Sequence, residues 1–219
     1  MPNIMVAPLP PGVSFEQAAT LPVAGLTAWH AQTKGGQLRG KRVLVNGASG
    51  GDGSLACQLA RHLGAEVVAA MQDSREETLV RRMGAERVAV GPDLSTAESM
   101  SSFHLILESV GGASLGAALG MLAPGGTCVL FGVSDASEVR FDAATFYRTG
   151  ATTLYDLVLR DEFQHESPSA GLERLSGLTA EGKLSSPVEV TAPWTRIAET
   201  AAGLMEHRFL GKAVMTLKT

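Results

Sequence analysis

The residues of this chain that could do chemistry are concentrated in one glycine-rich segment. Asn46-Gly47-Ala48-Ser49-Gly50-Gly51-Asp52-Gly53 follows the apolar run Val43-Leu44-Val45 and precedes an apolar helix that begins near Ser54. Glycine permits a tight turn and a close approach of the backbone, and the free N–H groups of the next helix stabilise an anion. The order of strand, glycine turn and helix predicts a dinucleotide-binding site. A tight turn without a ligand is the alternative.

The end of the second predicted strand should select the dinucleotide. An NAD site carries an acidic residue about 20 residues beyond the glycine loop, but this strand ends in Ala69-Ala70-Met71-Gln72. Ser74 and Arg75 lie just beyond and could bind a 2′-phosphate, which favours NADP. Asp73 is a contrary signal, because an inward carboxylate would repel that phosphate. Helix capping by Asp73 or Ser74, and a solvated Arg75, are the alternatives.

Alternating strands and helices position these residues. Strands are predicted at residues 43–45, 66–71, 87–90, 103–108, 128–131 and 152–159, with helices at 52–63, 74–84 and 113–122. A capping box begins a short helix at Ser14, and another helix extends from Pro22 to Gln32. This alternation predicts the α/β class, with a Rossmann-type doubly wound parallel sheet.

Three regions are predicted along the chain. Residues 1–40 form lead-in helices, residues 41–160 form the dinucleotide-binding domain, and residues 161–219 form a C-terminal extension that packs on it. After a loop at 160–168, the extension has helices at 170–181 and 195–207 and strands at 188–190 and 213–217.

Composition excludes several classes of protein. The 219 residues are 45% hydrophobic and 18% charged, which excludes a disordered chain. The formal net charge is −4, without a cluster of basic residues, so no nucleic-acid partner is expected. No apolar run approaches the roughly 20 residues of a membrane span, and no signal peptide is visible. We therefore expect a cytoplasmic protein with a small-molecule substrate and no membrane partner.

Other chemistry has little support. Cys57 and Cys128 lie far apart without a partner pattern, which argues against a disulfide framework or a four-cysteine zinc site. The five histidines show no metal-ligand spacing, so no metal is predicted. A hydrolase is not indicated, because the chain has no Gly-x-Ser-x-Gly elbow.

Several further stretches match a known family in order. They are Val13 to Ala19, Gly25-Leu26-Thr27-Ala28-Trp29, Val43 to Gly53, Gly84-Ala85, Glu108 to Gly112, Pro124-Gly125-Gly126 and Gly211 to Val214. With them the chain resembles the medium-chain dehydrogenase/reductase superfamily, in particular its zinc-independent quinone oxidoreductase and enoyl reductase branch. The resemblance implies hydride transfer from NADPH to a quinone or an activated alkene. It also implies a homodimer formed through the last sheet strand, here Thr152 to Leu159.

The resemblance implies roles for individual residues. Thr27 would lie near the nicotinamide, Ser74 and Arg75 at the adenosine phosphate, and the loop under the pyrophosphate, with Ser49, Gly50, Gly51, Asp52 and Gly53. The nicotinamide cleft would be lined by Val110, Phe131, Gly132 and Val133. Core packing of Val110 and Phe131, a backbone-bonded Thr27 hydroxyl and a strand-end turn at Gly132 are the alternatives. No catalytic residue is assigned.

The chain departs from the family in two ways. In the family, the cofactor domain follows a barrel-like domain of roughly 100 residues that builds much of the substrate pocket, and we expect this chain to begin after it. Asp52 stands where relatives usually have an apolar residue behind the nicotinamide. It could cap the next helix or face the cofactor.

The main hypothesis is the cofactor-binding portion of an NADPH-dependent oxidoreductase. The alternatives are a non-catalytic NADP-binding or dimerisation module that lacks its substrate domain, and a Rossmann scaffold used for non-redox chemistry. The family implies an enzyme, and the sequence leaves open whether this chain acts alone.

Overall fold

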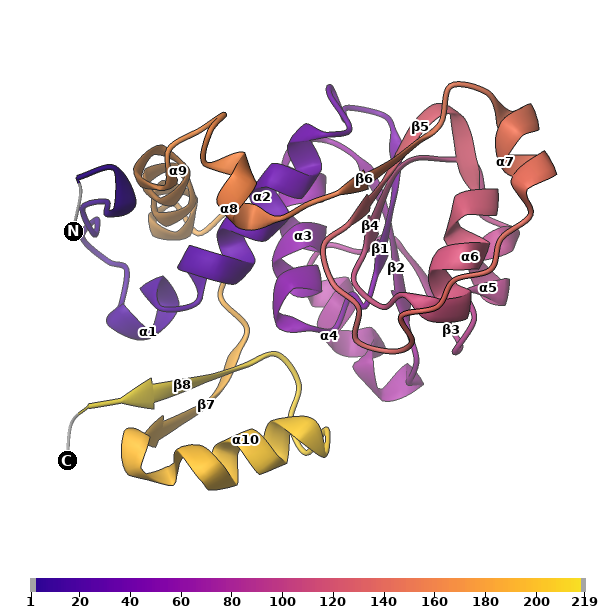
Figure 1. Cartoon of the computed structure of the whole chain (residues 1–219). Helices are drawn as coiled ribbons and strands as arrows, with labels where there is room; N and C mark the ends of the chain where they lie inside the picture. Colours follow the sequence, from indigo (N-terminus) through magenta and orange to yellow (C-terminus); the bar gives the residue numbers. More distant parts are fainter. Residues whose placement is uncertain (1–2, 218–219) are drawn as a thin grey trace.

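A six-stranded parallel sheet forms the centre of the molecule in the computed structural model, which describes residues 3–217 (Figure 1). The strand order is β3-β2-β1-β4-β5-β6, and each neighbouring pair is parallel. The strands are β1 (Arg42–Asn46), β2 (Glu66–Met71), β3 (Arg87–Val90), β4 (Phe103–Glu108), β5 (Leu122–Leu130) and β6 (Thr153–Asp156). The predicted doubly wound α/β fold is confirmed.

Helices cover both faces of the sheet, because alternate strand residues point to opposite sides. Val43 and Val45 pack in one core cluster with α2 (Leu26–Thr33), α3 (Gly51–His62) and α4 (Glu77–Arg82). Leu44, between them in sequence, packs in the other cluster. That second cluster contains residues of α5 (Ser95–Glu98), α6 (Gly112–Gly120) and α7 (Ala143–Thr149). The strand order reverses between β1 and β4, and ligands of open α/β sheets bind at this switch point.

The N-terminal helices lead directly into α2. They are the 3-10 helix η1 (Asn3–Met5), α1 (Phe15–Ala18) and the π-helical η2 (Leu21–Gly25). The predicted capping box is present, since the Gln17 N–H donates to Ser14 Oγ and the Ser14 N–H donates to Gln17 Oε1. This part of the lead-in was therefore readable from local sequence.

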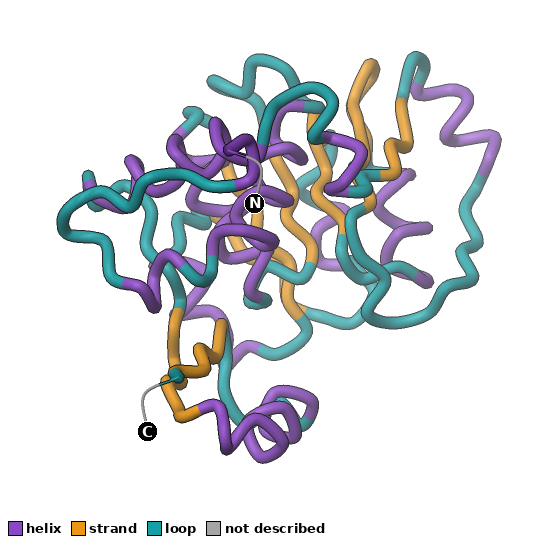
Figure 2. Tube along the Cα trace, turned by 60° about the vertical axis from the view of Figure 1, so that its left-hand side comes forward, coloured by secondary structure: helices purple, strands orange, loops and turns teal. Residues whose placement is uncertain are grey.

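The C-terminal elements separate into two groups. Helices α8 (Leu159–Glu162) and α9 (Pro168–Ala180) lie near the N-terminal helices (Figure 1). After them come β7 (Val188–Pro193), η4 (Trp194–Arg196), α10 (Ile197–Met205) and β8 (Lys212–Thr216). Strands β7 and β8 pair in parallel as a second sheet. Figure 2 shows this strand–helix–strand group, residues 188–216, below the main sheet, and we call it the C-terminal unit.

A buried carboxylate joins α8 to α2 and β6. Glu162 accepts hydrogen bonds from Lys34 Nζ at 2.7 Å and from the Tyr155 hydroxyl at 2.6 Å. Burial alone would raise the pKa of Glu162, but the hydrogen bonds from Lys34 and Tyr155 hold it below its ordinary value. Burial lowers the pKa of neighbouring His30, although the Glu162 charge opposes that shift. The cluster fixes the edge of the sheet to the helical layer.

Some predicted boundaries were wrong. Strand β5 begins at Leu122 and includes the predicted turn Pro124-Gly125-Gly126, with an irregular register opposite β4. Strand β6 is shorter than predicted, and α8 replaces the start of the loop predicted at 160–168. Helices α5 and α7 were not predicted. These helices have 4 to 7 residues, so their apolar periodicity is too brief to recognise.

The division at residues 40 and 160 stays a prediction. No helix among residues 3–217 is long and apolar enough to cross a membrane.

Candidate functional site

A cleft of about 1060 Å³ lies between the carboxyl ends of the sheet strands and the C-terminal unit. Its walls come from the glycine loop after β1, the segments after β2, β3, β4 and β5, and residues 209–215 of the C-terminal unit. Part of η2 also contributes. The cleft therefore lies where the fold class places its ligands.

The glycine loop has the geometry of a pyrophosphate cradle. Gly47 has φ +73°, a conformation that favours glycine. A Cβ on Gly53 would lie 2.2 Å from the Gly47 carbonyl oxygen, so no side chain fits between α3 and the loop. Gly50 is the N-cap of α3 and has no side chain to cover the first N–H groups of that helix. The positive end of the α3 dipole is thus presented to the cleft.

Hydrogen bonds below the loop connect it to the loop after β4. Glu108 is fully buried and accepts from Asn46 Nδ2 at 2.8 Å, from the Val110 N–H at 2.7 Å and from the Gly111 N–H at 3.0 Å. Asn46 Oδ1 in turn accepts from the Gly47 N–H. Burial raises the pKa of Glu108, although these hydrogen bonds oppose the shift. The two loops are held as one surface.

Asp52 and Lys212 meet at the glycine loop. Lys212, the first residue of β8, has its Nζ 3.8 Å from Asp52 Oδ1. A Cβ on Gly51 would lie 2.5 Å from that Nζ, so the lysine side chain lies directly over the loop. Asp52 is in the first turn of α3, but the N-cap is Gly50, so the predicted capping by Asp52 was wrong. The carboxylate lines the cleft, as its alternative interpretation required.

The segment after β2 is arranged differently from the sequence interpretation. Asp73 is the N-cap of the 3-10 helix η3 (Ser74–Glu76) and accepts from the Arg75 N–H at 2.8 Å and from Arg75 Nε at 2.6 Å. The capping alternative holds for Asp73 and was wrong for Ser74. Neither Ser74 nor Arg75 lines the cleft, whereas Gln72 and Glu76 do. The side chain of Arg75 is 86% exposed.

The structure brings most of the residues predicted to lie near the nicotinamide together in the cleft. Val110, Phe131, Gly132 and Val133 all line the cleft. Thr27 does not line it and is buried within α2, one turn beyond the η2 residues that do. Of the twelve predicted cofactor-binding residues, the cleft thus includes nine and leaves out Thr27, Ser74 and Arg75.

Sequence reasoning assigned no role to Lys212, Glu108 or Glu76. Lys212 and Glu108 stood in the stretches that match the family, which was a usable signal. Glu76 also had a signal, since it lies about 20 residues beyond the glycine loop, but its direction depends on how η3 turns after β2.

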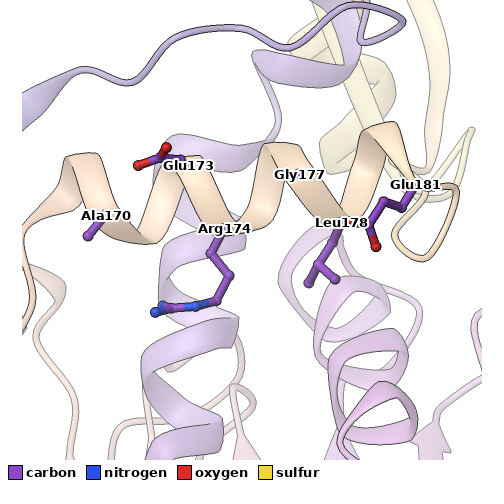
Figure 3. Close-up of a pocket in the computed structure, with 6 residues that line it drawn as sticks. All are labelled: Ala170, Glu173, Arg174, Gly177, Leu178 and Glu181. Atoms are coloured by element: carbon purple, nitrogen blue, oxygen red, sulfur yellow. The ribbon is translucent and has the colours of Figure 1, made fainter.

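A second pocket, of about 480 Å³, is a surface depression along α9 (Figure 3). It is lined by Ala170, Glu173, Arg174, Gly177, Leu178 and Glu181, all on this helix or at its C-cap. The Arg174 guanidinium is held by Glu166 at 2.6 Å and lies over the Trp29 ring. The depression offers no convergent set of groups for chemistry.

Nucleophiles and metal ligands are also scarce. Both cysteines are buried, and burial raises the pKa of the Cys57 thiol to about 12 and also raises that of Cys128. No group of three or more His, Cys, Asp or Glu side chains suited to a metal ion occurs within residues 3–217. Tyr147 is exposed on α7 and does not line the cleft.

Comparisons with known proteins give consistent results. A family model described as zinc-binding dehydrogenase matches residues 51–173. Polyketide synthase GfsB of Streptomyces halstedii is 32% identical over 219 residues, which cover 97% of this chain and 4% of that protein. Highly reducing polyketide synthase cla2 of Cladosporium cladosporioides is 28% identical over 224 residues, which cover 97% of this chain and 10% of that protein. The chain thus spans a small part of these curated relatives.

Solved structures agree with the fold. The quinone oxidoreductase from Thermus thermophilus, also solved in complex with NADPH, has a TM-score of 0.78 and 28% identity. The match covers 95% of this chain and 69% of that one. AibC has a TM-score of 0.84 and 26% identity, with 96% of this chain and 58% of that chain covered.

Proposed function

Because the chain belongs to the zinc-binding dehydrogenase family, within the medium-chain dehydrogenase/reductase superfamily, we propose that it is the dinucleotide-binding portion of a reductase. The cofactor is a nicotinamide dinucleotide that supplies hydride when it is bound. A quinone or an activated alkene accepts that hydride. The observation that carries this proposal is the cleft at the switch point of the sheet, with the glycine loop as its floor.

The cleft fits the cofactor in shape and in charge. Gly51 leaves its backbone uncovered next to the Lys212 side chain, and the buried Gly53 lets α3 pack directly against the Gly47 carbonyl. The pyrophosphate would bind at the first N–H groups of α3, beside the Lys212 ammonium. The nicotinamide would lie toward Val110 and Phe131. The role of the chain is to bind, orient and cover the cofactor.

Reducing polyketide synthases and a quinone oxidoreductase among the relatives support the two substrate classes. An enoyl group or a quinone is an electrophile that accepts hydride directly from a reduced nicotinamide. The proposed chemistry therefore depends on a bound cofactor and on a substrate oriented against it.

Two dinucleotides compete for this site. The sequence predicts NADPH, and the NADPH complex of the Thermus enzyme supports that proposal. Binding of the 2′-phosphate by Arg75 would require the guanidinium to leave Asp73 and turn toward the cleft. NADH binding requires no such change.

The exposed side chains of β6 support a homodimer through this edge strand. Leu154 is exposed there, and an unpaired edge of a sheet readily pairs with a second copy. A further domain that covers the nicotinamide is the other partner we propose. Trp194, Ile197 and Met205 of the C-terminal unit are exposed and could contact it. We propose a cytoplasmic location, as the sequence predicts.

A non-catalytic module is the second candidate. It is favoured by the exposed apolar side chains of the C-terminal unit, which are suited to contact another domain. A module would bind cofactor without transferring hydride, because the nicotinamide end of the cleft would stay open to water. Asp52 is the observation behind a third candidate, a scaffold for non-redox chemistry.

Fluorescence titration of the chain with NADH and with NADPH tests the proposal. We expect saturable binding of at least one, reversed by excess ADP-ribose, which carries the pyrophosphate but no nicotinamide. Absence of binding by both would contradict the proposed function. Oxidation of the bound cofactor by quinones or enones then separates a reductase from a binding module.

A further inference from the structure

Glu76 is an acidic residue of the cleft lining near the end of β2. It is the last residue of η3 and lines the cleft with Met71, Gln72, Gly91 and Pro92. Its Oε2 is buried and accepts no hydrogen bond from any of the residues that the structure describes. A buried carboxylate oxygen without a donor is costly unless a ligand or water supplies one.

The position of Glu76 is the adenosine end of the proposed cofactor site. In a doubly wound fold, the pyrophosphate lies at the glycine loop and the adenosine ribose lies over the end of the second strand. Glu76 follows the glycine loop by about the 20 residues at which an acidic side chain meets the ribose hydroxyls. An ionised carboxylate only accepts hydrogen bonds, and the ribose 2′ and 3′ hydroxyls can each donate one to it.

We propose that Glu76 binds the adenosine ribose hydroxyls and that this site therefore prefers NADH to NADPH. The inference rests on the proposed function, since it concerns the same cleft. It reverses the preference that Ser74 and Arg75 predicted.

The surrounding charges support this preference. Among residues 3–217, three acidic residues line the cleft, namely Asp52, Glu76 and Asp135. Its lining within the same residues includes one lysine, Lys212, and no arginine. Lys212 lies at Gly51 and Asp52, within the proposed pyrophosphate site. A 2′-phosphate would add nearly two negative charges beside the Glu76 carboxylate.

Arg75 is already occupied by another partner. Its guanidinium and its backbone N–H both bind Asp73, two residues earlier, and its side chain does not line the cleft. Hydrogen bonds from Arg75 lower the pKa of Asp73, so that carboxylate stays ionised at neutral pH. The group that could neutralise a 2′-phosphate is thus paired with an acidic neighbour.

The test compares both dinucleotides on the 219-residue chain by fluorescence titration. The variants are Glu76→Gln, which keeps the size and removes the charge, and Glu76→Lys, which reverses the charge. Glu77→Gln is the matched control, because Glu77 is the next residue, pairs with Arg81 on α4 and lies outside the cleft. Competition by 5′-AMP and by 2′,5′-ADP isolates the adenosine end, and thermal melting verifies that each variant is folded.

We expect NADH to bind the unmodified chain about tenfold or more tightly than NADPH, which is the effect of one charge-assisted hydrogen bond. Glu76→Gln should weaken NADH binding and bring the affinities for NADH and NADPH closer together. Glu76→Lys should make NADPH the tighter ligand, and Glu77→Gln should leave the ratio of the two affinities unchanged. Equal or tighter binding of NADPH by the unmodified chain would overturn the inference and leave the proposed function intact. An unchanged ratio in folded Glu76→Gln would also overturn it. Failure of both dinucleotides to bind would overturn the proposed function, and the inference with it.

Discussion

The two walls of the cleft are built in different ways. The glycine-loop wall has its polar groups buried and paired, with Glu108 and Asn46 joined beneath backbone that tolerates no added side chain. The opposite wall, from the C-terminal unit, has strand β8 half-buried throughout and only Gly203 buried on α10. One wall is fixed by close packing, whereas the other is held by partly exposed contacts.

The polar contacts that attach the C-terminal unit are few. Ser185 and Ser186, just before β7, bond to Gln58 of α3 and to Thr20. At the other end, Lys212 reaches Asp52. Such contacts contribute less to stability than a buried network does. We therefore expect changes in the first wall to affect folding and binding together, and changes in the second to affect binding alone.

The largest effect is expected from Gly53→Ala. The new Cβ would lie 2.2 Å from a backbone oxygen, which the loop relieves only by moving. We expect the free energy of unfolding to fall by about 3 kcal/mol and dinucleotide binding to be lost. Gly120→Ala is the matched control, because α6 has open space there. Urea unfolding measures the stability of both, and an equally stable Gly53→Ala protein would contradict the packing argument.

The next largest effect is expected from Glu108→Gln. The Gln amide accepts hydrogen bonds with only one oxygen. Its NH₂ group would face N–H donors that bind a carboxylate in the unmodified chain. Loss of these buried bonds should reduce the free energy of unfolding by about 2 kcal/mol. Glu98→Gln, at an exposed position on α5, should change little. If the two variants unfold at the same urea concentration, the network does not stabilise this wall.

A smaller effect is expected from pH, at the buried cluster of His30 and Glu162 that joins α2 to α8. The pKa of His30 is below its ordinary 6.5 in the folded chain, so the unfolded chain binds a proton at higher pH. Stability should therefore decrease as pH falls below about 6.5, until the folded His30 also becomes protonated. The facing charges are Glu162, Glu166, Lys34 and His165.

Thermal melting between about pH 5 and 7 measures this slope. In a His30→Gln variant the melting temperature should depend less steeply on pH. A His62→Gln variant, changed at an exposed position, should keep the pH dependence of the unmodified chain. An identical slope in all three proteins would assign the pH dependence to other groups.

The smallest change in stability is expected from Lys212→Met on the second wall. Its ion pair with Asp52 is long and partly exposed, so the free energy of unfolding should change by less than about 0.5 kcal/mol. Dinucleotide binding should weaken and lose part of its salt dependence, because the cation over the loop is removed. Lys183→Met is the control, since Lys183 pairs with Glu181 outside the cleft. Equal affinity of both variants would exclude Lys212 from the site.

Much of the main sheet could be read from local sequence. Strands β2, β3 and β4 have the predicted boundaries, since each is an apolar run of strand length. The glycine loop was also identified from local sequence, because its glycines stand between an apolar strand and an apolar helix. Strand β5 was harder, because its first half contains a proline and two glycines that indicate a turn. Only pairing with β4 makes that segment a strand.

The sequence by itself determined the fold class and the place of the cleft, because strand periodicity and the spacing of glycines are local properties of the chain. The tertiary structure decided which side chains face that cleft. Lys212 reaches Gly51 only through the path of the C-terminal unit, and Glu108 meets Asn46 only because β1 and β4 are neighbours. The turn of η3 points Glu76 inward and leaves Arg75 on Asp73. Side-chain direction depends on contacts between distant segments, which no local pattern encodes.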